Sequence, residues 1–88
     1  MPESEGFRIE NPAVRRMRPT AKLVYATIRD AERPLAQHEI ADRTNLNARG
    51  VRDVLEDLKD EDLVHVALNL KDMREKQYSL PEDSGEIY

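Results

Sequence analysis

Apolar residues recur at helical spacing through the N-terminal and central parts of this chain. Between Thr20 and Ala31, positions 23, 24, 27, 28 and 31 share one helix face and are all apolar or Thr. Tyr25 lies off the middle of this stripe, so we expect it at the edge of the stripe or in a contact between subunits. Glu32-Arg33-Pro34 ends the helix. Leu35 is a single apolar residue after this break. We expect it to hold the loop against the core and to lie in a very short strand.

A shorter helix is expected before this one. Asn11 is a suitable N-cap and Pro12 a suitable first helical residue. Pro19 limits the helix to about two turns, because the residue before a proline is pushed out of the helical region. Thr20 can cap the longer helix that follows.

Two further helices are predicted on either side of a tight turn. The first covers Gln37–Thr44, with Glu39 placed to accept a hydrogen bond at its start, although Ala36 at the N-cap position has no side-chain acceptor. Asn45 can adopt the left-handed conformation that ends a helix. Asn47 caps the second helix, which runs to about Asp60. Its apolar stripe consists of Val51, Val54, Leu55 and Leu58.

The C-terminal part predicts one β-hairpin. Val64, Val66 and Leu68 alternate with polar residues or alanine, as in a strand with one buried face. The charged segment 71–76 forms the tip, and Tyr78 and Leu80 alternate on the return strand. The fold class is therefore mainly α with a small β-hairpin (α+β).

The length of 88 residues allows one domain. We expect a flexible N-terminal arm over residues 1–10, the folded domain over residues 11–81 and an acidic C-terminal tail over residues 82–88. The chain has no cysteine, no signal peptide and no apolar run long enough for a membrane span, which favours a cytoplasmic protein.

Charge is the informative bulk property. Acidic residues outnumber basic ones by 18 to 14, whereas a nucleic-acid binder is expected to be basic, at least locally. Arginine is much commoner than lysine. An acidic, lysine-poor composition is typical of proteins in a high-salt cytoplasm, so a salt-adapted or archaeal source is a hypothesis from composition.

One segment departs from the acidic balance. Residues 11–28 contain no acid and four bases, namely Arg15, Arg16, Arg18 and Lys22. These residues are either the solvated face of a short helix or an arm that contacts phosphates, and the sequence favours neither interpretation.

No motif for catalysis or metal binding is present. There is no nucleophile elbow, glycine-rich phosphate loop or metal-binding helix motif. His38 and His65 lie on different predicted elements, and a zinc site needs three or four ligands. We therefore expect neither an enzyme nor a cofactor.

The order helix, helix, turn, helix, hairpin resembles the winged helix-turn-helix fold. The residues that carry the resemblance are Glu39-Ile40-Ala41, Thr44-Asn45-Leu46-Asn47, Val51, Leu55, Leu58, Leu63-Val64 and Tyr78-Ser79-Leu80. Within that fold the chain is similar to the MarR-like transcription regulators over roughly residues 19–81. Two positions differ from the family pattern: Asn45 replaces a frequent glycine, and Gly50 replaces a frequent serine or threonine. Gly50 either permits close approach to DNA or is simply tolerated, and we favour the second explanation.

The resemblance implies sequence-specific binding of double-stranded DNA by a small transcription regulator. The helix that begins after Asn47 would enter the major groove. Its expected base-contacting residues are Asn47, Ala48, Arg49, Arg52 and Asp53. The expected backbone and wing contacts are Arg15, Arg16, Arg18, Lys22, Lys71, Arg74 and Lys76. The acids of the second half of this helix and just after it are expected on the solvent side, away from the DNA: Glu56, Asp57, Asp60, Glu61 and Asp62.

The resemblance also implies a homodimer, which we expect to form through the N-terminal segment and the first full helix, with Val14, Met17 and Tyr25 contributing. The long dimerisation helices of full-sized relatives are missing from the pattern, so no small-molecule ligand is expected. The alternative is a winged-helix protein-protein interaction module or adaptor without direct DNA contact. The placement of the basic residues discriminates these two functions. Basic residues gathered on one face favour DNA binding, and acidic residues that interrupt this face favour the adaptor.

Overall fold

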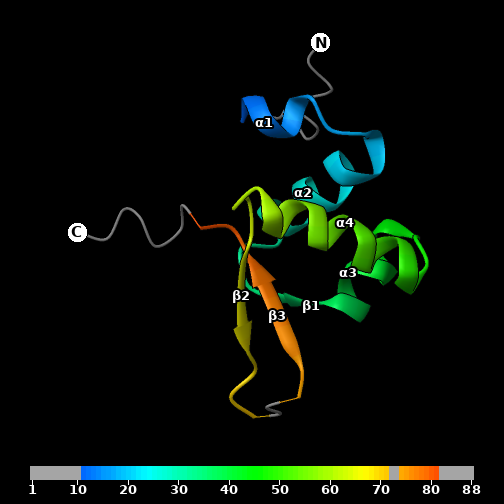
Figure 1. Ribbon diagram of the computed structural model, residues 1–88. Helices are drawn as coiled ribbons and strands as arrows, with labels where there is room; N and C mark the ends of the chain where they lie inside the picture. The colour runs from blue at the N-terminus through cyan, green and yellow to red at the C-terminus, as the bar shows by residue number, and fades with distance from the viewer. Residues whose placement is uncertain (1–10, 72–73, 82–88) are drawn as a thin grey trace.

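Side chains and backbone angles at the helix ends set the element boundaries of this chain. The computed structural model describes residues 11–71 and 74–81; the predicted N-terminal arm and acidic tail lie outside them. The elements are α1 (Pro12–Arg15), α2 (Pro19–Ala31), β1 (Leu35–Ala36), α3 (Gln37–Thr44), α4 (Ala48–Asp60), β2 (His65–Leu68) and β3 (Lys76–Ser79) (Figure 1).

The first helix begins where it was predicted but is shorter. The Asn11 side chain accepts a hydrogen bond from the Ala13 N–H at 2.9 Å, which confirms the cap. Helix α1 then lasts one turn instead of the expected two. The reason lies in Pro19, which requires extended backbone at Arg18 (ψ 161°), so the chain leaves the helix before that residue.

Helix α2 begins one residue before its predicted cap. Pro19 is the first helical residue and Arg18 holds the N-cap position without a side-chain hydrogen bond, so the prediction that Thr20 caps this helix is wrong. The predicted apolar stripe is rotated slightly in the structure. Tyr25 is only 6% exposed and belongs to the core of the chain itself, together with Val24 and Ile28.

Helix α3 has the predicted bounds. The Ala36 N–H donates to Glu39 Oε1 at 2.9 Å, so the glutamate supplies its half of the capping interaction, whereas the alanine has no acceptor to supply the other half. At the far end, Asn45 adopts the predicted left-handed conformation with φ of 63°. This residue turns the chain sharply towards α4.

The sheet contains the predicted hairpin and one further strand. Its order is β1-β3-β2, with both pairs antiparallel. Leu35 pairs with Tyr78 and is fully buried, which confirms the expected short strand and the pinning of its loop. The loop before α3 is therefore fixed to the base of the hairpin.

The core lies where α2, α3 and α4 meet the base of the sheet. Its fully buried side chains include Val14, Val24, Leu35, Ile40, Val51 and Leu58. The hairpin extends beyond these helices (Figure 1). For this reason the prediction of one buried strand face is wrong for β2: Val66 is half-buried and Leu68 is 47% exposed. Burial instead falls on Leu63 and Val64, just before the strand.

Candidate nucleic-acid interface

The start of α4 is held by hydrogen bonds from two sides. Asn47 Oδ1 accepts from the Gly50 N–H at 2.7 Å, which confirms the predicted cap. Gln37 Nε2, at the start of α3, donates to the Ala48 carbonyl oxygen at 3.1 Å. The first turn of α4 therefore has a fixed position relative to α3 and the turn between them.

Gly50 has a local role that the sequence did not indicate. A Cβ atom at this position would lie 3.2 Å from Asn47 Oδ1, the atom that caps the helix. This distance is tighter than an ordinary van der Waals contact. The glycine thus leaves room for the Asn47 side chain to bond to the Gly50 N–H.

The exposed surface of α4 carries both signs of charge. All five predicted base-contacting residues lie at its start and are exposed: Asn47, Ala48, Arg49, Arg52 and Asp53. Over the whole helix, which is described in full, the exposed charged residues are Arg49, Arg52, Asp53, Glu56, Asp57, Lys59 and Asp60. At 3.6 residues per turn, Arg52 and Lys59 fall on one edge of this surface, while Asp53 and Asp57 fall on the opposite edge.

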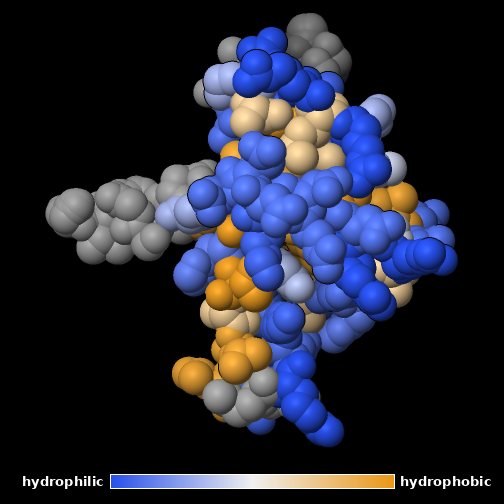
Figure 2. Space-filling model, in the orientation of Figure 1, coloured by the Kyte–Doolittle hydropathy of each residue, from blue (hydrophilic) through white to orange (hydrophobic). Residues whose placement is uncertain are grey.

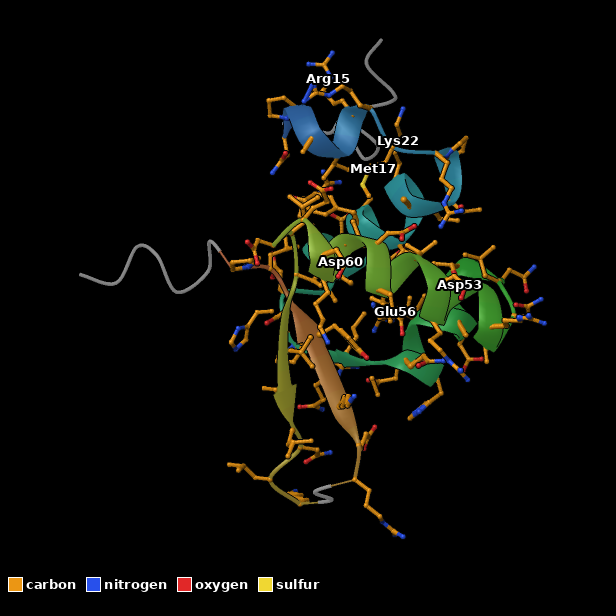
Figure 3. All side chains as sticks on the ribbon, viewed as in Figure 1. Arg15, Met17, Lys22, Asp53, Glu56 and Asp60 are labelled. Carbon is orange, nitrogen blue, oxygen red and sulfur yellow. The ribbon has the colours of Figure 1, made fainter. Side chains whose placement is uncertain are left out.

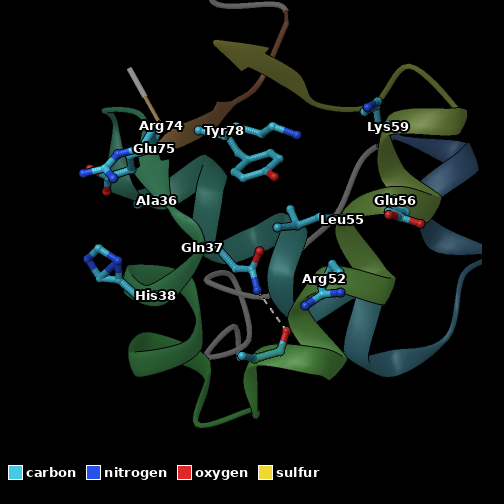
Figure 4. A pocket seen from close by; sticks show the side chains of 12 residues that line it. Ala36, Gln37, His38, Arg52, Leu55, Glu56, Lys59, Arg74, Glu75 and Tyr78 are labelled. Atoms are coloured by element: carbon cyan, nitrogen blue, oxygen red, sulfur yellow. Dashed lines mark hydrogen bonds between the residues drawn. The ribbon is translucent and has the colours of Figure 1, made fainter. Parts of the chain in front are cut away.

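The edge with the bases borders a groove. This groove has a volume of about 490 Å³ and lies between α4, the start of α3 and the hairpin (Figure 4). The bases among the described residues that line it are Arg52, Lys59, Arg74 and Lys76, against the acids Glu56 and Glu75. The fold therefore brings basic residues of α4 and of the hairpin to one hollow, although they are far apart in the sequence.

Glu56 corrects one expectation about the acids of α4. It was expected away from the proposed DNA groove, but its side chain lines the hollow together with Arg52 and Tyr78 (Figure 4). Burial raises the pKa of Tyr78 above 10.0, and the negative charge of Glu56 adds to the increase. The Tyr78 hydroxyl group therefore stays protonated at neutral pH and can donate a hydrogen bond.

The opposite edge of α4 is acidic and faces α1. Asp57 forms an ion pair with Arg18, with a distance of 2.6 Å between Oδ2 and Nη2. Asp53 and Asp60 lie along the same helix (Figure 3). One of the predicted backbone contacts, Arg18, is thus already paired with a carboxylate of α4.

The basic run and the hairpin bases lie at opposite ends of the described molecule. Arg15 and Lys22 lie on the α1 side of α4, whereas the hairpin lies on its other side (Figure 3). Lys76 is the first residue of β3 rather than part of the hairpin tip. Residues 72 and 73 of the expected tip lie outside the described part of the chain. The predicted bases therefore form two surfaces, separated by the acids of α4.

The hairpin exposes two large apolar side chains, and the sequence analysis predicted neither to be exposed. Leu70 is 90% exposed and Leu68 47%. Figure 2 shows apolar side chains gathered on the hairpin, whereas the surface over α4 is hydrophilic. The hydrophobic pattern of the sequence does not predict that Leu70 is exposed. Its exposure follows from the position of the hairpin, which extends beyond the helices (Figure 1).

Two of the three residues expected at a dimer interface are covered within one chain. Val14 is fully buried and Tyr25 is 6% exposed. Met17 is partly buried and packs against the same core. Because a side chain buried in its own subunit offers little surface to another, this part of the predicted interface is wrong for Val14 and Tyr25.

Two further kinds of feature are absent from residues 11–71 and 74–81, which the structure describes. No helix among them is long and apolar enough to cross a membrane. They contain no group of three or more His, Asp or Glu side chains arranged to hold a metal ion.

Comparison with known proteins supports the fold. No protein-family model matches the chain, and no curated protein matches it in sequence. Among solved structures, the PcaV transcriptional regulator of Streptomyces coelicolor superposes with a TM-score of 0.66 at 20% identity, over 80% of this chain and 48% of PcaV. The YusO protein of Bacillus subtilis superposes with a TM-score of 0.67 at 25% identity, over 77% of this chain and 48% of YusO.

A probable transcriptional regulator of Pseudomonas aeruginosa gives a TM-score of 0.70 at 21% identity, over 96% of this chain and 59% of that one. The chain thus spans about half the length of the first two matches. PcaV is described as a transcriptional regulator, and the Pseudomonas protein as a probable one. The chain is a winged helix-turn-helix domain with the fold of MarR-like transcriptional regulators.

Proposed function

We propose that this chain binds double-stranded DNA as a transcription regulator, with the first two turns of α4 in the major groove. The observation that carries this proposal is the basic hollow beside α4, where Arg52 and Lys59 meet Arg74 and Lys76 of the hairpin. A recognition helix with a hairpin at its side can contact base edges and the flanking backbone together. The structural likeness to PcaV and to the Pseudomonas regulator supports the same function.

Within this proposal, Arg49 and Arg52 read the sequence. Both are exposed on the first two turns of α4, and an arginine can donate two hydrogen bonds to guanine O6 and N7. Asn47 and Ala48 lie at the start of the helix, and Asp53 can accept from cytosine N4. Lys71, Arg74 and Lys76 contact the flanking phosphates or minor groove, which supplies much of the affinity and makes it salt-dependent.

The basic run at α1 has a secondary role in this proposal. Arg15 and Lys22 contact phosphates on the side of α4 opposite the hairpin, together with Arg16 at the end of α1. Arg18 contributes only after it leaves Asp57. A homodimer would double these contacts and match a palindromic site, and its interface uses surfaces other than the buried Val14 and Tyr25.

The acids of α4 favour a second candidate, an interaction module that does not bind DNA. Asp53 and Asp60 lie between the two basic surfaces (Figure 3), and Asp57 of the same helix is paired with Arg18. No continuous basic face therefore crosses α4. A phosphate backbone laid across these carboxylates would be repelled.

Selection from a random duplex pool followed by gel shift separates the two candidates. We expect a consensus sequence that the wild-type chain binds and for which both Arg49→Ala and Arg52→Ala lose about five- to 150-fold in affinity, since one bidentate contact is worth about 1–3 kcal/mol. Arg29→Ala is the matched control, because it removes the same charge from α2. No selected sequence and no shift at low or high salt would favour the interaction module.

A further inference from the structure

The tip of the hairpin presents an apolar side chain to solvent in a chain rich in charge. Leu70 is 90% exposed. Leu68 pairs with Lys76 across the hairpin, and paired residues of antiparallel strands point to the same face. Lys76 lines the hollow beside α4. The exposed Leu68 therefore lies on the sheet face that continues from this hollow towards the tip.

Hydrogen bonds from Asn69 hold the backbone on either side of Leu70. The Asn69 N–H donates to the Glu75 carbonyl oxygen at 2.8 Å, and Asn69 Nδ2 donates to Glu75 Oε1 at 3.0 Å. Asn69 Oδ1 accepts from the Lys71 N–H at 2.9 Å. The turn thus fixes the start of the tip, and Leu70 is presented from a defined backbone.

The charges around Leu70 fit a polyanion. Three bases, Lys71, Arg74 and Lys76, follow it within six residues of sequence, against two acids, Asp72 and Glu75. Glu75 already accepts a hydrogen bond from Asn69. The whole chain carries a net charge of −4, so the hairpin differs in sign from the rest of the molecule. Arg74 and Lys76 also line the hollow with Arg52, which makes the tip continuous with the proposed DNA interface.

We propose that Leu70, supported by Leu68, inserts into the minor groove that flanks the site of α4 and packs against sugars and an unstacked base step. Apolar side chains of this size can insert between base pairs and bend a duplex when neighbouring Lys or Arg side chains hold the phosphates. The inference rests on the proposed function and adds an apolar contact to it. It predicts that part of the affinity for DNA does not depend on salt.

The test measures binding and bending of one selected duplex by fluorescence anisotropy and by energy transfer between dyes at its ends. Leu70→Ser is expected to weaken binding by about ten-fold, since burial of a leucine is worth about 1.5–3 kcal/mol and 1.4 kcal/mol is ten-fold. It should leave the slope of affinity against salt unchanged and reduce the bend. Lys71→Ala should instead reduce that slope by about one.

Ala67→Ser is the matched control, because Ala67 is exposed on β2 and pairs with Gln77 on the opposite face of the hairpin. Unfolding temperatures of the variants exclude loss of the fold.

If Leu70→Ser binds and bends DNA like the wild type while Arg52→Ala does not bind, the wedge is wrong and the proposed function stands. If the wild type binds no duplex, the proposed function falls as well. If Leu70→Ser dissociates an oligomer of the DNA-free protein in sedimentation, the tip is a subunit contact and the wedge is wrong.

Discussion

Asparagine side chains shape the turns on which the proposed interface depends. Asn47 caps α4 and Asn69 organises the hairpin tip, both by accepting a backbone N–H. Asn45 adopts a positive φ that most residues avoid. The short amide side chain can serve each of these purposes because it reaches its neighbouring backbone without a long flexible stem.

The contact between Gly50 and the Asn47 cap leads to a stability prediction. Gly→Ala in a helix is expected to stabilise by about 1 kcal/mol. Gly50→Ala should gain clearly less than this, because its Cβ would lie 3.2 Å from Asn47 Oδ1. In the Asn47→Ala background, which lacks this oxygen, the same change should give the full gain. Urea unfolding of the four proteins of this cycle measures the difference, and equal gains in both backgrounds would contradict the account.

Glu39 gives the domain a predicted dependence on pH. Hydrogen bonds from the Ala36 N–H and then from Arg33 lower the pKa of Glu39 from its ordinary value of 4.5. A carboxyl group with a lowered pKa stabilises the folded state above its unfolded pKa, and this contribution is lost as the pH falls through the folded pKa. Glu39→Gln should therefore destabilise the domain at pH 7 and less so in acid.

The measurement is thermal unfolding of the wild type and of Glu39→Gln between pH 7 and pH 3. Glu32→Gln provides the control, because it neutralises an exposed acid in the loop that precedes β1. A difference between the wild type and Glu39→Gln that stays constant over the whole range would show that the charge of Glu39 does not matter.

At the scale of the elements, α4 separates two basic surfaces and is linked to one of them. The Arg18–Asp57 pair connects the segment before α2 to α4, but both side chains are about half exposed (53% and 50%). Exposed ion pairs contribute about 0–1 kcal/mol to stability. The pair therefore matters more for the charge that Arg18 can offer to DNA than for the free energy of unfolding.

Asp57→Asn should separate these two effects. We expect a change of at most about 1 kcal/mol in the free energy of unfolding, together with a two- to ten-fold gain in duplex affinity, up to about 1.4 kcal/mol. The gain arises because the variant removes a negative charge from α4 and releases Arg18. Asp30→Asn makes the same change of net charge on α2 and should have a smaller effect. Weaker binding by Asp57→Asn would mean that the pair positions α4.

The elements were predictable where local chemistry decides them. The caps at Asn11 and Asn47 and the turn at Asn45 depend on neighbouring backbone, and the sequence located all three. The side of α4 on which Glu56 lies and the exposure of Leu70 depend on where the hairpin packs. The spacing of apolar residues in the sequence does not determine how the hairpin packs on the helices. These two features of the site could therefore be identified only from the structure.

At the scale of the whole molecule, the net charge of −4 opposes the binding of DNA, whereas the basic residues of the hairpin and of the hollow favour it. Binding therefore depends on how the charges are arranged, and a duplex must approach along the basic hollow and avoid the acids that face α1. Such an interaction weakens as salt rises. The central claim is thus that one particular face of the domain contacts DNA.

Chemical-shift mapping of the labelled chain during titration with a duplex from the selected pool tests this claim most directly. We expect the amide signals that move most to belong to Asn47 and residues 48–59 of α4, to Gln37 and His38 beside the hollow, and to residues 68–71 and 74–76 of the hairpin. Signals of Arg29 and Asp30 on α2 should stay in place. Shifts confined to other surfaces, or no shifts at any duplex concentration and salt, would contradict the account.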